Sequence, residues 1–341
     1  MKQKKVTFAD IAAYTGFSKT TISRYFNHPD SLTFENQEKI AHALDVLGYQ
    51  ENKLAKVLAN GKSEFVGIII PNLYLHYYSE MLNQLLSTYE KYNYKFLVFI
   101  GNNKKEIEEK YIHELMAYKI EGLIVLSNTI SSEELASYKL PVVTIERECD
   151  HVCSVSTDNY LGGVQATSLL IRNKCDVILH INSIFPDTLP TYGRIRGFED
   201  ICNEHHVVHE LIQRNLGNTY QETLTQLKNI FNEIEEKYPS QKKGVFLAND
   251  TYASMFLNLI FQKYGKLPKD YQIVGFDDSP IASEAILPIT TVGQQIEKIA
   301  QTAMELLVLQ MNEMKKRKPA PLKEPVHKQI TPVLIRRNTT D

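Results

Sequence analysis

The sequence lacks any long hydrophobic run. None of its stretches approaches the roughly 18 consecutive apolar residues that a membrane helix needs. The basic start at residues 1–5 leads directly into the polar segment 7–10, without the apolar centre of a secretory signal peptide. We therefore expect a protein that stays in the cytoplasm and has no membrane partner.

Cysteine, glycine and proline are also scarce. The four cysteines, at positions 149, 153, 175 and 202, are too few to cross-link 341 residues, and a reducing compartment would keep them as thiols. Only 15 glycines and 13 prolines, with 43% hydrophobic and 23% charged residues, exclude a collagen-like, disordered or low-complexity chain. The length predicts two or three packed domains.

The motifs of common enzymes are missing. The sequence has no phosphate-binding G-x-x-x-x-G-K-[ST], no dinucleotide-binding G-x-G-x-x-G and no G-x-S-x-G nucleophile motif. The nearest approaches to a metal site are Cys149-x-x-x-Cys153 around His151 and the run H-H-x-x-H at 205–209, and both lack further ligands at the spacing of a zinc site. We expect no catalytic residue, no metal and no cofactor.

The net charge of −2 conceals an uneven distribution. Residues 1–62 carry nine Lys and Arg against six Asp and Glu, a net charge of +3, and the remainder carries −5. Within residues 1–27 the balance is +4. A local patch of positive potential favours a nucleic-acid partner, although an ordinary solvated surface would give the same counts.

Three short helices are predicted in this basic segment. A capping-box pattern at 7–10 begins the first helix, and Gly16 ends it. Ser18 can cap a second helix over 19–27, and a third follows over about 33–48. Three helices in about 45 residues form a small all-α unit.

The second helix has an apolar face and a hydrogen-bonding face. Ile22, Tyr25 and Phe26 lie at helical spacing and form the inward stripe. The outward row consists of Lys19, Thr20, Ser23 and Arg24. Ala12, Gly16 and Ile22 stand where a helix-turn-helix needs a small residue, a left-handed turn and an apolar anchor. An unrelated three-helix bundle would explain the stripe but not the exposed row, where a recognition helix reaches base edges.

Residues 6–24 read V-T-F-A-D-I-A-A-Y-T-G-F-S-K-T-T-I-S-R. This segment closely resembles the head of the lactose-repressor (LacI/GalR) family, whose pattern is V-T-x-x-D-[IV]-A-x-x-[AT]-G-[VF]-S-x-x-T-[VI]-S-R. The similarity continues through 47–49, Asn52 and 55–59, and then at intervals to 331–337, so it spans nearly the whole chain. It implies a helix-turn-helix head followed by an α/β body of two lobes with a type I periplasmic-binding-protein-like fold.

The resemblance implies a repressor that binds a palindromic operator as a homodimer. Lys19 and Arg24 suit guanine edges, and Thr20 suits a thymine methyl group. The residues better placed for phosphates are Thr7, Ser18, Ser23, Asn27 and Asn52. The expected DNA-binding residues are Thr7, Ser18, Lys19, Thr20, Thr21, Ser23, Arg24, Asn27, Tyr49, Asn52, Lys53, Ala55 and Leu58. Relatives with an extra heptad-bearing tail form tetramers, and because this chain ends at Asp341 we expect a dimer.

A hinge is expected between head and body. Residues 52–60 are fair helix formers ended by Gly61, but a helix of about this length is marginal in water because few hydrogen bonds offset its nucleation cost. By the resemblance, the two hinges of a dimer fold against each other on the operator, and Leu58 is the wedge that opens a base step in the minor groove. A linker helix packed on the body is the alternative.

The body reads as alternating strands and helices, which is typical of parallel βαβ units. The expected strands are 66–71, 96–100, 123–126, 142–146, 177–182, 244–249 and 273–277. The expected helices are 76–91, 105–118, 160–172, 191–204, 219–238, 250–264 and 295–315. The resemblance implies three crossings between lobes, near 161, 291 and 323. The expected domains are a head over 1–50, a hinge and linker over 51–62, and a body over 63–341 whose lobes comprise about 63–161 with 292–323 and 162–291 with 324–341.

Polar residues directly after strands are candidates for a ligand site. Glu146, Asn249 and Asp277 each follow an apolar run, and ligands of open parallel sheets collect at the carboxyl ends of strands. Asp250 and Asp278 follow the same runs but more often cap the next helix.

The resemblance adds further ligand positions. Arg194 begins R-I-R-G-F, which is similar to the family's effector-arginine segment R-x-x-G-[FW], and Glu146 stands where relatives have Asp. The expected effector-binding residues are His76, Glu146, Arg194, Asn249, Asp277 and Gln294. Their carboxylate, amide and guanidinium groups suit a sugar or a sugar derivative. Residues 173–176 read N-K-C-D where relatives often have Gly-His, which weakens any closer assignment of the effector.

Two other functions share part of this pattern. A solute-binding protein of a transport system has the same two lobes but needs an export signal. An enzyme with a fused regulatory head needs a nucleophile or a metal. A small-molecule-controlled, DNA-binding transcriptional regulator therefore remains the first hypothesis.

Overall fold

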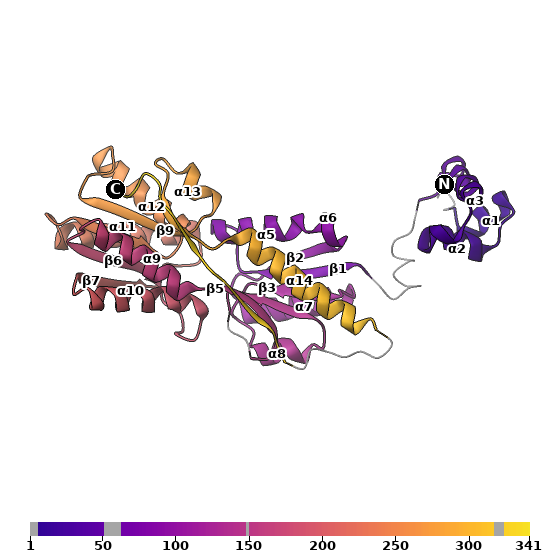
Figure 1. Cartoon of the computed structure of the whole chain (residues 1–341), viewed down its shortest axis with the longest axis horizontal. Helices are drawn as coiled ribbons and strands as arrows, with labels where there is room; N and C mark the ends of the chain where they lie inside the picture. Colours follow the sequence, from indigo (N-terminus) through magenta and orange to yellow (C-terminus); the bar gives the residue numbers. More distant parts are fainter. Residues whose placement is uncertain (1–5, 51–62, 148–149, 317–323) are drawn as a thin grey trace. The chain divides into compact units, whose positions relative to one another are not determined.

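Two separate units make up the chain. The computed structural model describes residues 6–50, 63–147, 150–316 and 324–341. One unit, Met1–Lys62, contains the helical head, and the other, Ser63–Asp341, is the α/β body (Figure 1). In these described ranges, no helix combines the length and the apolar character that a bilayer crossing requires.

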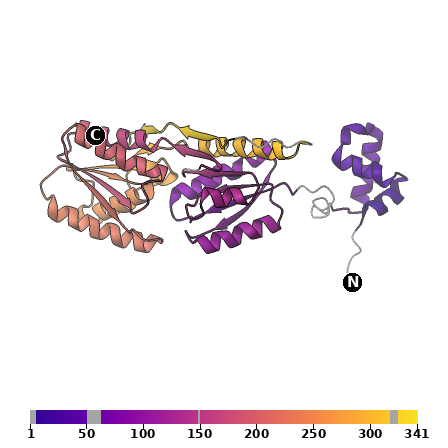
Figure 2. The same ribbon diagram turned by 90° about the horizontal axis from the view of Figure 1, so that it is seen from below.

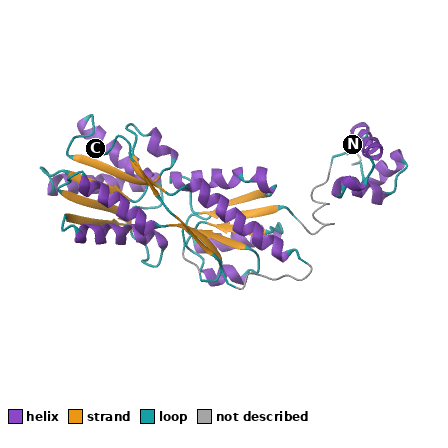
Figure 3. Ribbon diagram, in the orientation of Figure 1, coloured by secondary structure: helices purple, strands orange, loops and turns teal. Residues whose placement is uncertain are grey.

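The head contains the three predicted helices, α1 (Phe8–Thr15), α2 (Lys19–Asn27) and α3 (Phe34–Val46), with a 3-10 turn at Pro29–Ser31 (Figure 3). The amide of Thr7 donates to Oδ2 of Asp10 over 2.8 Å, which completes the capping box of α1. Gly16 ends α1 at a φ of 73°, a left-handed conformation that favours glycine.

A small core fixes the rotation of α2. The fully buried residues of the head are Ile11, Ile22, Ile40 and Ala43. Phe8 stacks on Phe26 with 5.2 Å between ring centroids, and Tyr49 lies 5.8 Å from Phe8. Because Ile22 points into this core, the opposite side of α2 faces solvent.

The first lobe is built on a six-stranded parallel sheet in the order β11-β5-β4-β3-β1-β2. Its strands are β1 (Phe65–Ile70), β2 (Lys95–Ile100), β3 (Gly122–Val125), β4 (Val142–Ile145), β5 (Cys153–Thr157) and β11 (His327–Ile330). One face packs against α5 (His76–Ser87) and α14 (Ile296–Met314), and α6 (Tyr89–Tyr92) follows α5. The other face packs against α7 (Lys105–Ala117) and α8 (Ser132–Ser137).

The second lobe has a six-stranded sheet in the order β12-β10-β9-β8-β6-β7, in which only the β10–β12 pairing is antiparallel. Its strands are β6 (Val177–Ser183), β7 (Val208–Arg214), β8 (Lys243–Leu247), β9 (Tyr271–Asp277), β10 (Thr290–Gly293) and β12 (Val333–Ile335). Figure 2 shows helices on both sides of each sheet of the body.

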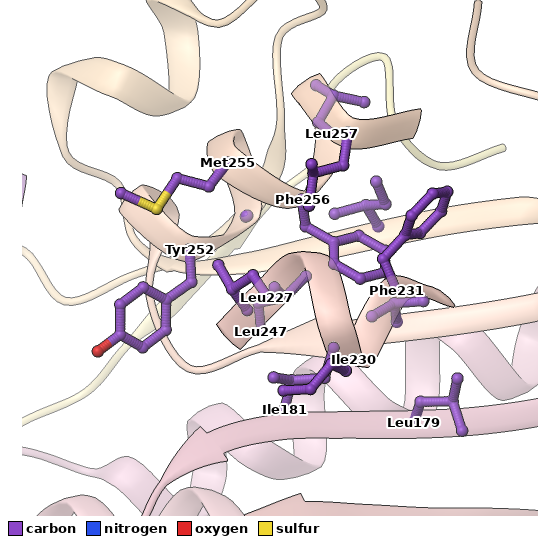
Figure 4. Packing of buried hydrophobic residues seen from close by; sticks show 14 of the residues in the cluster. Leu179, Ile181, Leu227, Ile230, Phe231, Leu247, Tyr252, Met255, Phe256 and Leu257 are labelled. Atoms are coloured by element: carbon purple, nitrogen blue, oxygen red, sulfur yellow. The ribbon is translucent and has the colours of Figure 1, made fainter. Parts of the chain in front are cut away.

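Four longer helices cover the second sheet. On one face lie α9 (Asn159–Arg172) and α10 (Gly193–Glu204), which follows a 3-10 turn at Pro190–Tyr192. On the other lie α11 (Tyr220–Lys237) and α12 (Asp250–Tyr264), and a short helix α13 (Pro280–Glu284) follows β9. Figure 4 shows the apolar side chains of α11 and α12 meeting those of β6 and β8, with the hydroxyl of Tyr252 pointing away from them.

The chain passes between the two sheets three times. The passages follow Thr157, Gly293 and Ile330, where β5, β10 and β11 end. The third lies later than the position near 323 expected from the sequence, because β11 pairs with β5 and so extends the first sheet. Strands β5, β7, β10, β11 and β12 were not predicted; β7, β11 and β12 lie at sheet edges, and β5 and β10 lie next to β11 and β12.

A buried histidine lies in the core of the second lobe. His180 of β6 is fully buried and stacks on Phe246 with 4.3 Å between ring centroids. Its Nδ1 lies 3.0 Å from the carbonyl oxygen of Phe246, and its Nε2 lies 3.3 Å from Nδ2 of Asn182. Burial lowers the pKa of His180 to about 3, so the ring stays neutral in the folded protein.

This burial predicts a loss of stability in acid. A histidine in an unfolded chain has a pKa of about 6.5, so below that pH the unfolded chain binds a proton at His180 that the folded protein does not bind. His180 should therefore lower the free energy of unfolding by up to about 1.4 kcal/mol per pH unit as the pH falls from about 6.5 towards 3. Urea unfolding between pH 7.5 and 5 should show a shallower pH dependence in His180→Gln. His205→Gln, at the exposed end of α10, should keep the original slope, and equal slopes in all three proteins would contradict the prediction.

Candidate functional site: a helix surface and a cleft between lobes

The exposed face of α2 carries three predicted DNA-binding side chains. Lys19, Thr20 and Arg24 are solvent-exposed on the side away from Ile22. Ser18 holds the start of this helix, because its Oγ accepts the amide of Thr21 over 3.1 Å and lies 2.9 Å from the Thr21 hydroxyl. Two cations and a hydroxyl therefore lie on one rigid helical turn and a half, a suitable size for a DNA major groove.

Other predicted DNA-binding residues already have partners in the head. The hydroxyl of Thr7 donates to Asp10 over 2.6 Å, and Nδ2 of Asn27 donates to the carbonyl and the hydroxyl of Ser23 over 3.0 and 3.2 Å. The ring of Tyr49 packs on Phe8 and Phe26. The remaining predicted positions, Asn52, Lys53, Ala55 and Leu58, lie outside the described residues, as does the expected hinge.

In the body, Glu146 lies where β4 ends. It is buried and adopts a left-handed φ of 54°. Its Oε1 accepts the amide of Thr157 over 2.6 Å, and its Oε2 accepts Nδ2 of Asn159 over 2.9 Å. The carboxylate therefore binds the segment at which the chain first passes to the second lobe.

Arg194 reaches the same segment from the second lobe. It lies in the first turn of α10, and its Nε donates to Oδ1 of Asn159 over 2.7 Å. Its Nη1 donates to the carbonyl of Ala248 over 2.6 Å, and the guanidinium carbon lies 3.7 Å from the ring centroid of Phe276. Asn159 therefore joins Glu146 of one lobe to Arg194 of the other.

Asp277 and Gln294 form a second connection. Asp277 ends β9 at a φ of 117°, and its Oδ1 accepts Nε2 of Gln294 over 2.6 Å. Oε1 of Gln294 accepts the hydroxyl of Thr157 over 2.6 Å. Burial raises the pKa of Asp277, and the nearby positive charge of Arg194 opposes that rise.

His76 and Asn249 lie at the starts of two helices. The amide of His76 donates to Oγ1 of Thr251 over 3.0 Å, and its Nδ1 lies at the same distance from that hydroxyl, so α5 of the first lobe meets α12 of the second. Burial lowers the pKa of His76, against the raising effect of Glu284. Asn249 caps α12 by accepting the amide of Tyr252 over 2.8 Å.

The two aspartates expected to act as helix caps have other partners. Oδ1 of Asp250 accepts the Thr291 hydroxyl over 2.6 Å, and its Oδ2 accepts the amide of Ser279 over 2.9 Å. Burial raises the pKa of Asp250 to about 7, and these hydrogen bonds oppose the rise. Asp278 is paired with Arg337 at 2.6 Å.

Several residues that lie among the predicted ones were not predicted from the sequence. Thr157 and Asn159 link the charged groups, as described above. The hydroxyl of Tyr77 is buried without a hydrogen-bond partner within the described residues. Burial raises the pKa of this hydroxyl, and the negative charges of Glu146 and Asp277 raise it further. The paired tyrosines directly after His76 are the signal in the sequence that could have pointed to this position.

A cavity of about 430 Å³ adjoins this network. It is lined by Thr157 and Asn159, together with Arg147, Asp150, Ser154, Ser156, Asp158, Tyr160, Pro190, Gly193, His327, Lys328 and Gln329. A second cavity of about 280 Å³ has Asp277 and Asp278 in its wall. The hydroxyl, carboxylate and amide groups around the first cavity can bind a polyhydroxylated ligand. In the described ranges, no group of three or more His, Cys, Asp or Glu side chains is arranged to hold a metal ion.

Known proteins resemble the chain over nearly its full length. It is 26% identical to the sucrose operon repressor of Streptococcus mutans, over 88% of this chain and 91% of that protein. It is also 26% identical to the ribose operon repressor of Bacillus subtilis, over 89% of this chain and 90% of that protein.

Solved structures agree with the fold. The Lac repressor dimer bound to operator and the anti-inducer ONPF matches with a TM-score of 0.81 at 21% identity, over 99% of each chain. A protein from Alkaliphilus metalliredigens complexed with D-xylulofuranose matches with a TM-score of 0.68 at 26% identity, over 82% of this chain and 100% of that one. The expected fold class is confirmed.

Two family models match the chain. Residues 7–52 match bacterial regulatory proteins of the lacI family, and residues 168–340, about half of the chain, match the periplasmic binding protein-like domain. The resemblance drawn from residues 6–24 is thereby confirmed. The chain therefore belongs to the periplasmic binding protein-like family through its body and carries a head of the lacI family of bacterial regulatory proteins.

Proposed function

We propose that the protein is a sequence-specific transcriptional repressor that binds palindromic DNA through its head and a small ligand through its body. The observation that carries this proposal is the exposed row of Lys19, Thr20 and Arg24, fixed on α2 by the Ser18 cap and the buried Ile22. Relatives that the chain matches over about nine-tenths of its length are operon repressors. The domains then act as a DNA-binding head over 1–50, a hinge and linker over 51–62 and a ligand-binding body over 63–341.

On DNA, α2 lies in the major groove. Lys19 and Arg24 donate to guanine edges and Thr20 contacts a thymine methyl group, while the polar groups at the start of α2 and α1 contact phosphates. Lys39, the third lysine or arginine of residues 6–50, pairs with Glu35 on α3 at 3.1 Å and so lies away from this row.

The ligand is a sugar or a sugar derivative. The groups gathered between the lobes are two carboxylates, two amides, a guanidinium and a hydroxyl, which match the alternating donors and acceptors of vicinal sugar hydroxyls. The sucrose and ribose operon repressors among the relatives support this class of ligand. The ligand changes operator affinity by binding one arrangement of the lobes more tightly than the other, typically by about 1–3 kcal/mol.

A second copy of the chain covers one edge of the first lobe. β2 lies at the end of its sheet, and Phe96 and Val98 stay partly exposed although they pack against the core. Leu86 and Tyr89, on the helices α5 and α6 that precede this strand in the chain, are 40% and 45% exposed. An exposed apolar edge strand invites pairing, so we assign this surface to a homodimer that presents two heads to a palindrome.

The protein then has a regulatory and not a catalytic role. It acts in the cytoplasm, the compartment that contains its operator. A mobility-shift assay on palindromic DNA selected from a random library by the full-length protein tests it directly. A solute-binding protein would select no sequence and would leave the DNA unretarded.

Arg24 should be essential for operator recognition. A bidentate contact to a base is worth about 1–3 kcal/mol, so Arg24→Ala should raise the dissociation constant for the selected operator by roughly 5- to 150-fold for each half-site of the palindrome. Lys39→Ala, the matched loss of an exposed cation on α3, should change it by less than about threefold. If both variants bind the operator as well as the wild type does, the assignment of α2 as the recognition helix is wrong.

Arg194 should be needed for the response to sugar. Arg194→Lys keeps the charge but loses the planar stacking on Phe276 and the fork that joins Asn159 to Ala248. Thermal shifts with sucrose, ribose and cellobiose should identify a sugar that stabilises the wild type. The variant should bind that sugar at least tenfold more weakly while its sugar-free operator affinity is unchanged. Arg196→Lys, on the exposed side of α10, is the control, and a variant that keeps sugar affinity but loses operator binding would reverse the assignment.

The surface beside β2 should hold the dimer together. Leu86→Lys places a charge in the proposed apolar contact and should shift the protein to monomer at micromolar concentration, measured by sedimentation velocity. Met116→Lys introduces the same charge at a similarly exposed apolar residue, 39% exposed on α7, and should leave the dimer intact. A Leu86→Lys protein that sediments like the wild type would place the interface elsewhere.

A further inference from the structure

We propose that the hydrogen bond between Thr157 and Gln294 fixes the angle between the two lobes in the ligand-free protein. This goes beyond the proposed function, because it concerns the geometry of the empty body and requires neither DNA nor sugar. Both residues lie where the chain passes from one lobe to the other, because Thr157 is the last residue of β5 and Gln294 directly follows β10. The bond therefore joins two of the three connections about which the lobes can rotate.

The pair is anchored in both lobes. On the first-lobe side, the amide of Thr157 donates to Oε1 of Glu146 over 2.6 Å. On the second-lobe side, Nε2 of Gln294 donates to Oδ1 of Asp277 over 2.6 Å, and the backbone amide of Gln294 donates to the backbone carbonyl of Asp277 over 3.2 Å. A rotation of the lobes must stretch at least one link in this chain.

Burial makes these links costly to break. The four side chains, Glu146, Thr157, Asp277 and Gln294, are each 8% exposed or less. A buried polar group that loses its partner also lacks water to replace it, so it must open the site to solvent or find another partner. The third passage is held to the first two, because the amide of Asp158 donates to Ile330 over 2.9 Å and the Gln295 side chain donates to Thr331.

Through this pair, a ligand in the cleft can change the angle between the lobes. A ligand hydroxyl that donates to Oδ1 of Asp277 would compete with Nε2 of Gln294, whose Oε1 accepts the hydroxyl of Thr157. Gln294 is thereby a positioning residue between the ligand and the connections that join the lobes. This step rests on the proposed function, whereas the bond between Thr157 and Gln294 does not.

Hydrogen exchange of the full-length, ligand-free protein tests the inference. Thr157→Val keeps the shape of the side chain and removes the hydroxyl that donates to Gln294. The peptides spanning 155–160 and 290–296 should then exchange about tenfold faster, which corresponds to about 1.4 kcal/mol of opening free energy. The amide of His76 should also exchange faster, because its bond to Thr251 joins the lobes at a separate point.

Two variants separate the hydroxyl from general packing. Thr157→Ser restores the donor and should return all three regions to wild-type exchange. Thr167→Val changes a buried threonine of α9 whose hydroxyl has no partner within the described residues, and it should alter none of them. If Thr157→Val does not fold, Gln294→Asn shortens the same bridge from its other end and should give the same three changes.

Three results would overturn the proposal. Wild-type exchange in Thr157→Val would show that the bond does not restrain the angle between the lobes. Faster exchange confined to 155–160, with His76 unchanged, would show a local packing defect. A Thr157→Ser protein as loose as Thr157→Val would show that the hydroxyl is not responsible. Each of these results leaves the DNA-binding proposal standing, since no operator is used.

Discussion

Charged and amide groups are buried at the carboxyl ends of the strands in both sheets, where they have to hydrogen-bond to one another, and the body is arranged around that constraint. In a parallel sheet the carboxyl ends of the strands lie on the same side, and here those sides of the two sheets face each other. A carboxylate or guanidinium taken out of water needs partners of fixed geometry. Asn159 and Gln294 provide them, because a single amide can donate to one lobe and accept from the other. The groups that can bind a ligand are therefore the groups that hold the lobes together.

The sequence predicts local features of the fold well and non-local features poorly. The capping box at Thr7, the cap at Ser18 and the left-handed turn at Gly16 depend on neighbouring residues, so the helices of the head begin and end near their predicted positions. The central strands are rich in apolar residues because they are buried on both faces. β11 is mostly exposed and β7 is only partly buried, and the assignment of both depends on a partner strand that is not adjacent in the sequence. The pairing of β11 with β5 also moves the third passage beyond its expected position.

The site could be predicted as a set of positions but not as a set of contacts. Position after a strand was enough to select Glu146 and Asp277, which lie on different sheets. Their side-chain directions depend on left-handed backbone at both residues, φ of 54° and 117°, and nothing in the residue types announces this. Asn249 was selected as a ligand position, whereas its side chain caps a helix. The links that Thr157 and Asn159 make between the lobes depend on partners far along the chain, so their neighbours in the sequence do not indicate them.

The motif R-x-x-G at 194–197 shows how backbone packing and site chemistry are joined. A Cβ added to Gly197 would lie 2.4 Å from the carbonyl oxygen of Tyr160, and one added to Gly163 would lie 2.4 Å from that of Arg194. Both contacts are with backbone, which cannot move aside, so only glycine allows α9 and α10 to approach this closely. That approach sets the distance between the first turns of the two helices, and Asn159 and Arg194 lie there, with 2.7 Å between Oδ1 and Nε. The glycine is as necessary to the site as the arginine, because a wider helix pair would separate Arg194 from Asn159 and leave two buried polar groups without partners.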